Sequence, residues 1–320
     1  MSPSWAHTRK PALFKQLSLY RIAPDWSASL DHIHTALTVR RFVPCGATQE
    51  KSSGWVEPRG EAHGPLAEGV GQHTILKFQA ESKTVPSAVV RQHAQAAADE
   101  IEAQSGRKPG KKEMRNLRDD AKLALLSMAF ARQSSTWVWI DAERRLLMTD
   151  AGNQARTDDL ITALVEALPG LNPTLLQTTH SPAHAMAQCL LAQSPDEWPS
   201  GLSVERECEL RSNDEDKSVV RYTRHHLLND EVRQHLQRGL QPKRLAMSWE
   251  GRVSFVLTDS MQLKKIGFLD GVIPSSGQDD SGFDADVAIS TGELRQLIPD
   301  LIEALGGERV PRAAPANIGT

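Results

Sequence analysis

The 320-residue chain is poor in cysteine, with only Cys45, Cys189 and Cys208, which are odd in number and far apart. Because no Cys-x-x-Cys pair is present, the common zinc and thiol-redox motifs are excluded. We expect three reduced thiols in a reducing compartment. No run approaches about 18 apolar residues, and the N-terminus lacks the apolar segment of a signal peptide. These absences predict a cytoplasmic protein without a membrane partner.

Motifs of catalysis and cofactor binding are missing too. No Walker A loop and no Gly-x-Ser-x-Gly elbow is present, and Gly69-x-Gly71 lacks the third glycine of a dinucleotide fingerprint. His180 and His184 have the spacing of a helical zinc pair, but Pro182 lies between them and the general-base glutamate is absent. We therefore expect neither a metal nor a cofactor.

One acidic pair leaves a nuclease hypothesis open. Asp284 and Asp286 would share a face if their segment is a strand, as a carboxylate metal site requires. No third ligand or phosphate loop accompanies them, so a role in a turn and a strand entry fits better. We predict that the protein is not an enzyme.

Charge is distributed unevenly along the chain, although the net charge is only −3. Residues 1–160 carry 22 Lys and Arg against 18 Asp and Glu, whereas residues 161–320 carry 15 against 22. The two halves therefore have net charges of +4 and −7. Because local fields decide where a polyanion docks, this balance does not exclude nucleic acid.

Residues 107–122 form a first basic stretch, with seven cations against three acids. On a helix Lys111, Arg115 and Arg118 follow i, i+4, i+7 spacing and therefore share one face. Lys112 is the next residue after Lys111. Such a face fits a row of DNA phosphates, and it fits an ordinary solvated helix face equally well.

Residues 221–245 form a second basic stretch, with six cations against two acids. This stretch too fits either DNA phosphates or an ordinary solvated surface. Between the two stretches, Phe130 follows the first basic helix and precedes Arg132. A phenylalanine at a helix end commonly packs in a core, and the alternative is a wedge or stacking contact with DNA.

Periodicity predicts mixed helices and strands without a repeating βαβ order, which indicates an α+β fold. Strands are expected at 14–21, 73–79, 136–141, 144–149, 203–210, 218–223, 243–249, 252–258, 261–268 and 286–290. Helices are expected at 27–40, 88–105, 111–128, 157–168, after Pro182, from Asn229 to Gly239 and from Thr291 to Gly306. Residues 44–71 and 274–282 read as loops, and residues 1–11 and 309–320 as disordered ends. The two central helices form a helical hairpin over about 86–130.

A series of short motifs resembles one known family, the recombination-associated protein RdgC of proteobacteria, over residues 12–308. The motifs are Leu13-Phe14-Lys15-Gln16-Leu17 with Tyr20-Arg21, Phe42-x-Pro44-Cys45-Gly46, Gly54-Trp55-Val56-x-Pro58, Pro86-Ser87, Trp139-Ile140-Asp141, Leu245-Ala246-Met247-x-Trp249, Phe283-Asp284-Ala285-Asp286, Thr291-Gly292-Glu293-Leu294 and Glu303-Ala304-Leu305-Gly306-Gly307-Glu308. No single motif is decisive, and their joint order carries the resemblance.

The resemblance implies a horseshoe-shaped α+β subunit with antiparallel sheets that joins a second copy into a closed homodimeric ring. Double-stranded DNA would pass through the ring without sequence preference, on the nucleoid. The protein would then limit the access of RecA during recombination and replication-fork repair. A rival hypothesis is a protein–protein module that acts mainly on the recombinase filament.

The resemblance also implies site residues. Phe130 matches an aromatic near the ring opening, and Arg224 and His225 match a basic run that faces DNA. The sequence departs from the family pattern at two places: Ser127-Met128 stands where the family has Pro-Arg, and the second run keeps Arg224 as its one permanent cation. The predicted DNA-binding set is Lys111, Lys112, Arg115, Arg118, Phe130, Arg132, Arg224 and His225.

Overall fold

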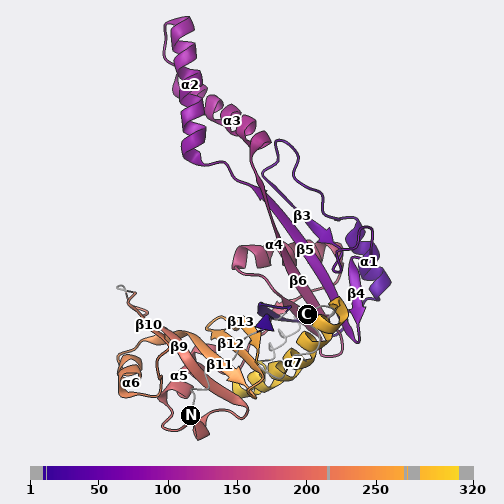
Figure 1. Cartoon of the computed structure of the whole chain (residues 1–320), viewed down its shortest axis with the longest axis vertical. Coiled ribbons are helices and arrows are strands. Elements are labelled where there is room, and N and C mark those ends of the chain that lie inside the picture. Colours follow the sequence, from indigo (N-terminus) through magenta and orange to yellow (C-terminus); the bar gives the residue numbers. More distant parts are fainter. Residues whose placement is uncertain (1–9, 12, 215–216, 270–271, 273–281, 310–320) are drawn as a thin grey trace, which may run out of the picture.

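The computed structural model describes residues 10–11, 13–214, 217–269, 272 and 282–309. Within them, thirteen strands form one antiparallel sheet that is accompanied by seven α-helices, which confirms the α+β class (Figure 1). The main strand order is β10-β9-β11-β12-β13-β2-β7-β6-β5-β3. β1 pairs with β13, β4 with β5 and β8 with β2 at the margins. No helix in these residues has the length and apolar character needed to cross a bilayer.

The strands are β1 (Lys10–Pro11), β2 (Gln16–Arg21), β3 (Lys51–Val56), β4 (Ala67–Val70), β5 (His73–Lys83), β6 (Ala131–Asp141), β7 (Leu146–Thr149), β8 (Thr174–Leu175), β9 (Leu202–Arg211), β10 (Val219–Thr223), β11 (Gln241–Trp249), β12 (Val253–Thr258) and β13 (Gln262–Phe268). The helices are α1 (Leu30–Thr38), α2 (Ser87–Ser105), α3 (Lys111–Met128), α4 (Gln154–Ala167), α5 (Pro182–Leu191), α6 (Asp230–Gln237) and α7 (Phe283–Ala304). The disorder predicted for the two ends concerns residues that lie mostly outside the described ranges, although Lys10–Pro11 pairs with β13. Nearly all of the predicted loop 274–282 lies outside them as well.

The sheet carries two hydrophobic cores. The larger core joins β9 to β13 with α5, α6 and α7, and it also contains Phe14 stacked on Trp139 at 5.6 Å. The smaller core joins β3 to β7 with α1 and α4 around the fully buried Trp55. Alternating residues of β2 and β6 enter different cores, as the two-residue period of a strand requires. The shared strands therefore unite both cores in one body.

Helices α2 and α3 form the helical arm, defined as residues 87–128, which projects from one end of the molecule (Figure 1). Gly106 has φ +69° and ends α2 in the left-handed conformation that glycine adopts without strain. Small Ala94 and Ala98 are buried in α2, as is Leu126 in α3. The rest of the arm is largely polar and solvated, and its two helices agree with the predicted helical hairpin.

The predicted loop 44–71 was wrong in part, because it contains β3 and β4. The strand β3 was not predicted because its Ser-Ser-Gly sequence is more typical of a loop. Gly54 is required there, since a Cβ atom would lie 2.6 Å from the Cα atom of Phe42. The backbone around Phe42 lies directly beside β3, and the Phe42 N–H donates to the Trp55 carbonyl at 2.9 Å.

The prediction at the C-terminal helix was also wrong. Residues 286–290 belong to α7 instead of a strand, and Thr291 does not cap a helix. Its buried hydroxyl donates to the Val287 carbonyl at 2.8 Å inside the helix. Val287, Leu294 and Leu301 share a buried stripe with the helical period, which the short alternation at 286–290 concealed.

Asp150 joins the end of β7 to the start of β2. Its Oδ1 accepts a hydrogen bond from the Gln16 N–H at 3.1 Å. Burial raises the pKa of this carboxyl to about 7, although the backbone N–H groups of Lys15 and Gln16 oppose the shift. The folded protein therefore holds a proton on Asp150 at mildly acidic pH that the unfolded chain has already released.

The raised pKa of Asp150 predicts a pH dependence of stability. Between the ordinary value of 3.8 and about 7, unfolding releases this proton, so the free energy of unfolding falls as pH rises through that window. Asp150→Asn keeps an acceptor for Gln16 and cannot ionise. We expect the variant to lose less stability between pH 5 and pH 8 than the wild type, by roughly 1–3 kcal/mol. Urea denaturation at both pH values measures this, and equal losses would contradict it.

Candidate nucleic-acid interface

The cations of the helical arm divide into two groups by their pairing. Arg107 contacts Glu113 at 3.0 Å, Lys108 lies 3.9 Å from Glu102, and Lys122 pairs with Glu50. The remaining five are exposed and form no ion pair within the described residues, and they are Arg91 on α2 and the four predicted cations of α3: Lys111, Lys112, Arg115 and Arg118. The internal pairing therefore leaves the predicted set available to an external anion.

Phe130 lies between α3 and β6, and its side chain is 97 % exposed. This exposure excludes the core-packing interpretation. Met128 and Leu123, near the end of α3, are exposed as well. Arg132 follows on β6, where it is exposed, pairs in register with Ser82 and forms no ion pair among the residues described. The junction of the arm with the sheet thus combines an apolar surface with an unpaired cation.

Arg224 and His225 follow the end of β10. Arg224 has φ +55°, so the chain turns sharply there and leaves the side chain exposed. The His225 ring lies 5.3 Å from the Tyr222 ring, and its Nδ1 is 2.9 Å from the His226 carbonyl oxygen. Figure 1 shows β10 and α6 at the end of the molecule away from the helical arm. A single subunit therefore does not bring the two predicted groups together.

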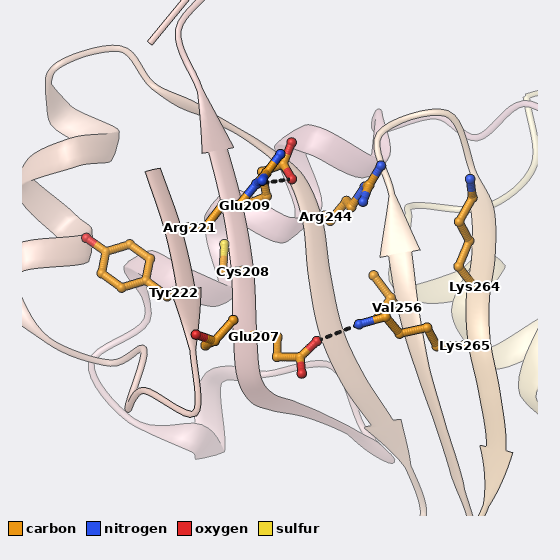
Figure 2. Close-up of a pocket in the computed structure, with 10 residues that line it drawn as sticks. Glu207, Cys208, Glu209, Arg221, Tyr222, Arg244, Val256, Lys264 and Lys265 are labelled. Carbon is orange, nitrogen blue, oxygen red and sulfur yellow. Dashed lines mark hydrogen bonds and ion pairs between the residues drawn. The ribbon is translucent and has the colours of Figure 1, made fainter. Parts of the chain in front are cut away.

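The structure reveals a third cationic surface that the sequence analysis did not identify as one site. A cavity of about 360 Å³ lies on the open face of β9 to β13 (Figure 2). Its charged lining consists of Glu207, Glu209, Arg221, Arg244, Lys264 and Lys265, hereafter the cationic sheet face. The sequence contains one signal of this surface, the alternation of charged and apolar residues, because most of these residues adjoin a buried apolar residue of the same strand. Arg221 and Arg244 were noted only as members of a basic stretch.

The acidic and histidine pairs stand without a third metal ligand in the described part of the chain. Asp284 and Asp286 lie in the first turn of a helix, where i and i+2 side chains face apart, and Arg59 binds Asp284 at 2.6 Å. The rings of His180 and His184 are 5.5 Å apart. Across the part of the chain that the structure describes, no cluster of three or more His, Cys, Asp or Glu side chains suits a metal ion.

Comparison with known proteins places these features in a family. The profile described as "Putative exonuclease, RdgC" matches residues 12–308. The recombination-associated protein RdgC of Herminiimonas arsenicoxydans is 39 % identical over 303 residues, which cover 93 % of this chain and 99 % of that protein. Its namesake from Janthinobacterium sp. (strain Marseille) is 38 % identical, with coverage of 92 % and 98 %.

The relative from Dechloromonas aromatica (strain RCB), with the same name, is 38 % identical and covers 93 % of this chain. Both the profile and these relatives extend over nearly all of the region in which the ordered motifs occur. The resemblance noted in the sequence is thus confirmed, and the chain belongs to the RdgC family.

Proposed function

We propose that the protein binds double-stranded DNA without sequence preference and so limits the access of RecA during recombination and replication-fork repair. The observation that carries this proposal is the group of four unpaired, exposed cations on α3 of the projecting helical arm. Phosphate contacts of this kind position a protein on DNA and carry no base information. The name shared by the relatives, recombination-associated protein, agrees with this role.

A closed homodimeric ring supplies the geometry of the proposal. The arm and the β10–α6 region lie at opposite ends of the subunit (Figure 1). A two-fold related copy that contacts both ends would enclose a central opening, with the subunit acting as a horseshoe. Arg224 and His225 would then face the same duplex as the arm of one of the two copies. The excess negative charge of the second half of the chain would lie outside the opening, where it does not oppose DNA binding.

Phe130 has a distinct role in the proposal. A fully exposed phenylalanine beside unpaired cations is suited to insertion between base steps or to stacking on a base. Either contact works with any sequence, because every base has an apolar face. Phe130 would thus add an apolar contact to phosphate binding.

We propose further that the protein is not an enzyme, in spite of the exonuclease description attached to the family profile. Asp284 is engaged by Arg59, and Asp286 points to another side of the helix. The alternative function remains a protein–protein module that acts mainly on the recombinase filament. Exposed Leu123 and Met128 on the arm favour that alternative, since apolar surface patches mark protein contacts.

The first prediction of this proposal concerns the salt dependence of DNA binding. Fluorescence anisotropy with a duplex of arbitrary sequence should give a log Kd that changes linearly with log salt, by about 0.9 per phosphate neutralised. The triple variant Lys111→Gln, Arg115→Gln, Arg118→Gln should reduce the slope by up to about three phosphates. The matched control is Arg107→Gln, Lys108→Gln, Lys122→Gln, which removes the same charge from cations that are already paired.

The control triple variant should retain most of the wild-type slope. A flat salt response of the wild type would contradict the proposal, and so would equal losses in the two triple variants. An assay of RecA-catalysed strand exchange distinguishes the DNA-binding function from the alternative protein–protein function. If the first triple variant no longer binds DNA and still inhibits strand exchange, the protein–protein function is correct.

The second prediction concerns Phe130. Because its side chain is 97 % exposed, Phe130→Ala should change the free energy of unfolding by no more than about 0.5 kcal/mol. Its affinity for duplex DNA should fall by roughly 1–3 kcal/mol with an unchanged salt slope, since no charge is removed. Phe130→Trp is the conservative control and should restore binding. Wild-type affinity in Phe130→Ala would exclude a wedge or stacking contact.

The third prediction is that no nuclease activity will be found. Linear duplex and single-stranded DNA incubated with the protein and Mg²⁺ or Mn²⁺ should stay intact on a denaturing gel. The decisive control is Asp284→Asn, Asp286→Asn. Cleavage by the wild type that this variant abolishes would show a metal-dependent nuclease and overturn the non-enzymatic assignment.

A further inference from the structure

The cationic sheet face follows from the two-residue period of the strands. Cys208, Tyr222, Leu245 and Leu263 belong to the larger core, together with buried residues of α5 and α7. The neighbours of these residues along each strand must point to the opposite side of the sheet. Those neighbours include the charged residues that line the cavity in Figure 2. One face of this half of the sheet is therefore apolar and covered, and the other is charged.

The acids on this face are already engaged by cations at its margins. Glu209 is buried and accepts hydrogen bonds from Arg221 at 3.0 Å and from Arg211 at 3.4 Å. Glu207 contacts Lys265 at 2.9 Å. Both carboxylates thus have partners, and their charge is largely compensated without the remaining two cations.

Arg244 and Lys264 are those remaining cations. Arg244 extends from β11 and Lys264 from β13, and Figure 2 shows their charged ends at the same end of the cavity with β12 between them. Neither forms an ion pair within the described residues. Two cations that share a cavity and lack an internal partner leave a local positive field that a bound anion would compensate.

The lining also indicates which kind of anion fits. The Tyr222 ring points away from the cavity in Figure 2, and its hydroxyl donates to Glu231 at 3.2 Å. Among the described residues no other aromatic side chain lines this cavity, so they offer no platform on which a base could stack. Recognition would depend on charge alone, which suits a phosphodiester and not a nucleoside.

We propose that Arg244 and Lys264 bind a backbone phosphate of duplex DNA on the cationic sheet face. This contact is additional to the arm, to Phe130 and to the turn at Arg224, and it rests on the proposed DNA-binding function. It would place the duplex against the sheet at the end of the subunit that lies away from the arm (Figure 1). The protein would then hold DNA at both of its ends through phosphates only.

Charge-neutralising variants test this inference. Because both cations contact one phosphate, the double variant Arg244→Gln, Lys264→Gln should reduce the salt slope of duplex binding by about 0.9 and weaken binding several-fold near 0.15 M salt. Arg244→Gln and Lys264→Gln should each give part of that loss. The matched control is Arg238→Gln, because Arg238 belongs to the same basic stretch and is exposed and unpaired among the described residues, yet ends α6 outside the cavity. Arg238→Gln should keep the wild-type slope.

A gain of binding provides the converse test. Glu207→Gln removes a half-exposed acid and releases Lys265, so the affinity for duplex DNA should rise several-fold. Lys264→Arg keeps the charge and should bind like the wild type, and thermal unfolding of every variant identifies any that fails to fold. If the folded Arg244→Gln and Lys264→Gln variants keep the wild-type slope while the arm variant loses it, only this inference is overturned.

The remaining outcomes separate the source of the phosphate and the proposed function itself. Calorimetric titration with inorganic phosphate shows whether a free anion uses the site. Phosphate binding that is lost in Arg244→Gln, with duplex binding unchanged, would overturn the assignment to DNA. A wild-type protein that fails to bind duplex at low salt would overturn the proposed function, and this inference with it.

Discussion

The rest of the structure depends on the attachment of α7 to the turn between β6 and β7. Pro299 lies inside α7 and has no N–H, so the Arg295 carbonyl one turn earlier lacks its helical donor. The Arg144 guanidinium donates to that carbonyl instead. The Arg295 side chain in turn contacts the buried Asp141 at 3.1 Å and pairs with Glu143. A helix of the larger core is thereby fixed to a turn that the smaller core supports, and neither core can rotate against the other without exposing a buried carboxylate.

This attachment matters because the arm stands far from it. β5 and β6 pair along eleven residues each, about 36 Å of strand, but their apolar residues occupy only the end near α7. Beyond that end the ladder is polar: the Gln79 amide N–H donates to the Gln133 side-chain oxygen at 2.9 Å, and Gln133 donates to the buried Glu81 at 2.7 Å. These hydrogen bonds continue the β5–β6 ladder toward the arm and Phe130, so the sheet determines where the proposed DNA contacts lie.

The same features explain how far sequence reasoning reached. Helices α2 and α3 were predicted although they are largely polar, because the Gly/Pro-containing segment 106–110 separates them. The strands of the larger core were predicted from their apolar alternation, and the structure contains all of these elements. The outer parts of β5 and β6 were missed because polar ladders carry no apolar alternation. The strand predicted at 286–290 was wrong because five residues of alternation cannot exclude a helix, and the stripe through Leu294 and Leu301 decides it. The arm cations are neighbours in sequence and were found, whereas Arg244 and Lys264 meet only through the pairing of β11, β12 and β13.

Pairing, rather than the number of cations, separates the candidate surfaces from ordinary charged faces. Both basic stretches have a net charge of +4, but much of that charge is used internally, as at Lys122 with Glu50 and Lys243 with Asp259. A cation that is already paired must lose its partner before it can neutralise a phosphate, and the two energies largely cancel. An unpaired cation such as Arg115 or Arg244 only releases counterions from the DNA, which is favourable at moderate salt. A chain with a net charge of −3 can therefore bind a polyanion, provided that its unpaired cations lie along one path.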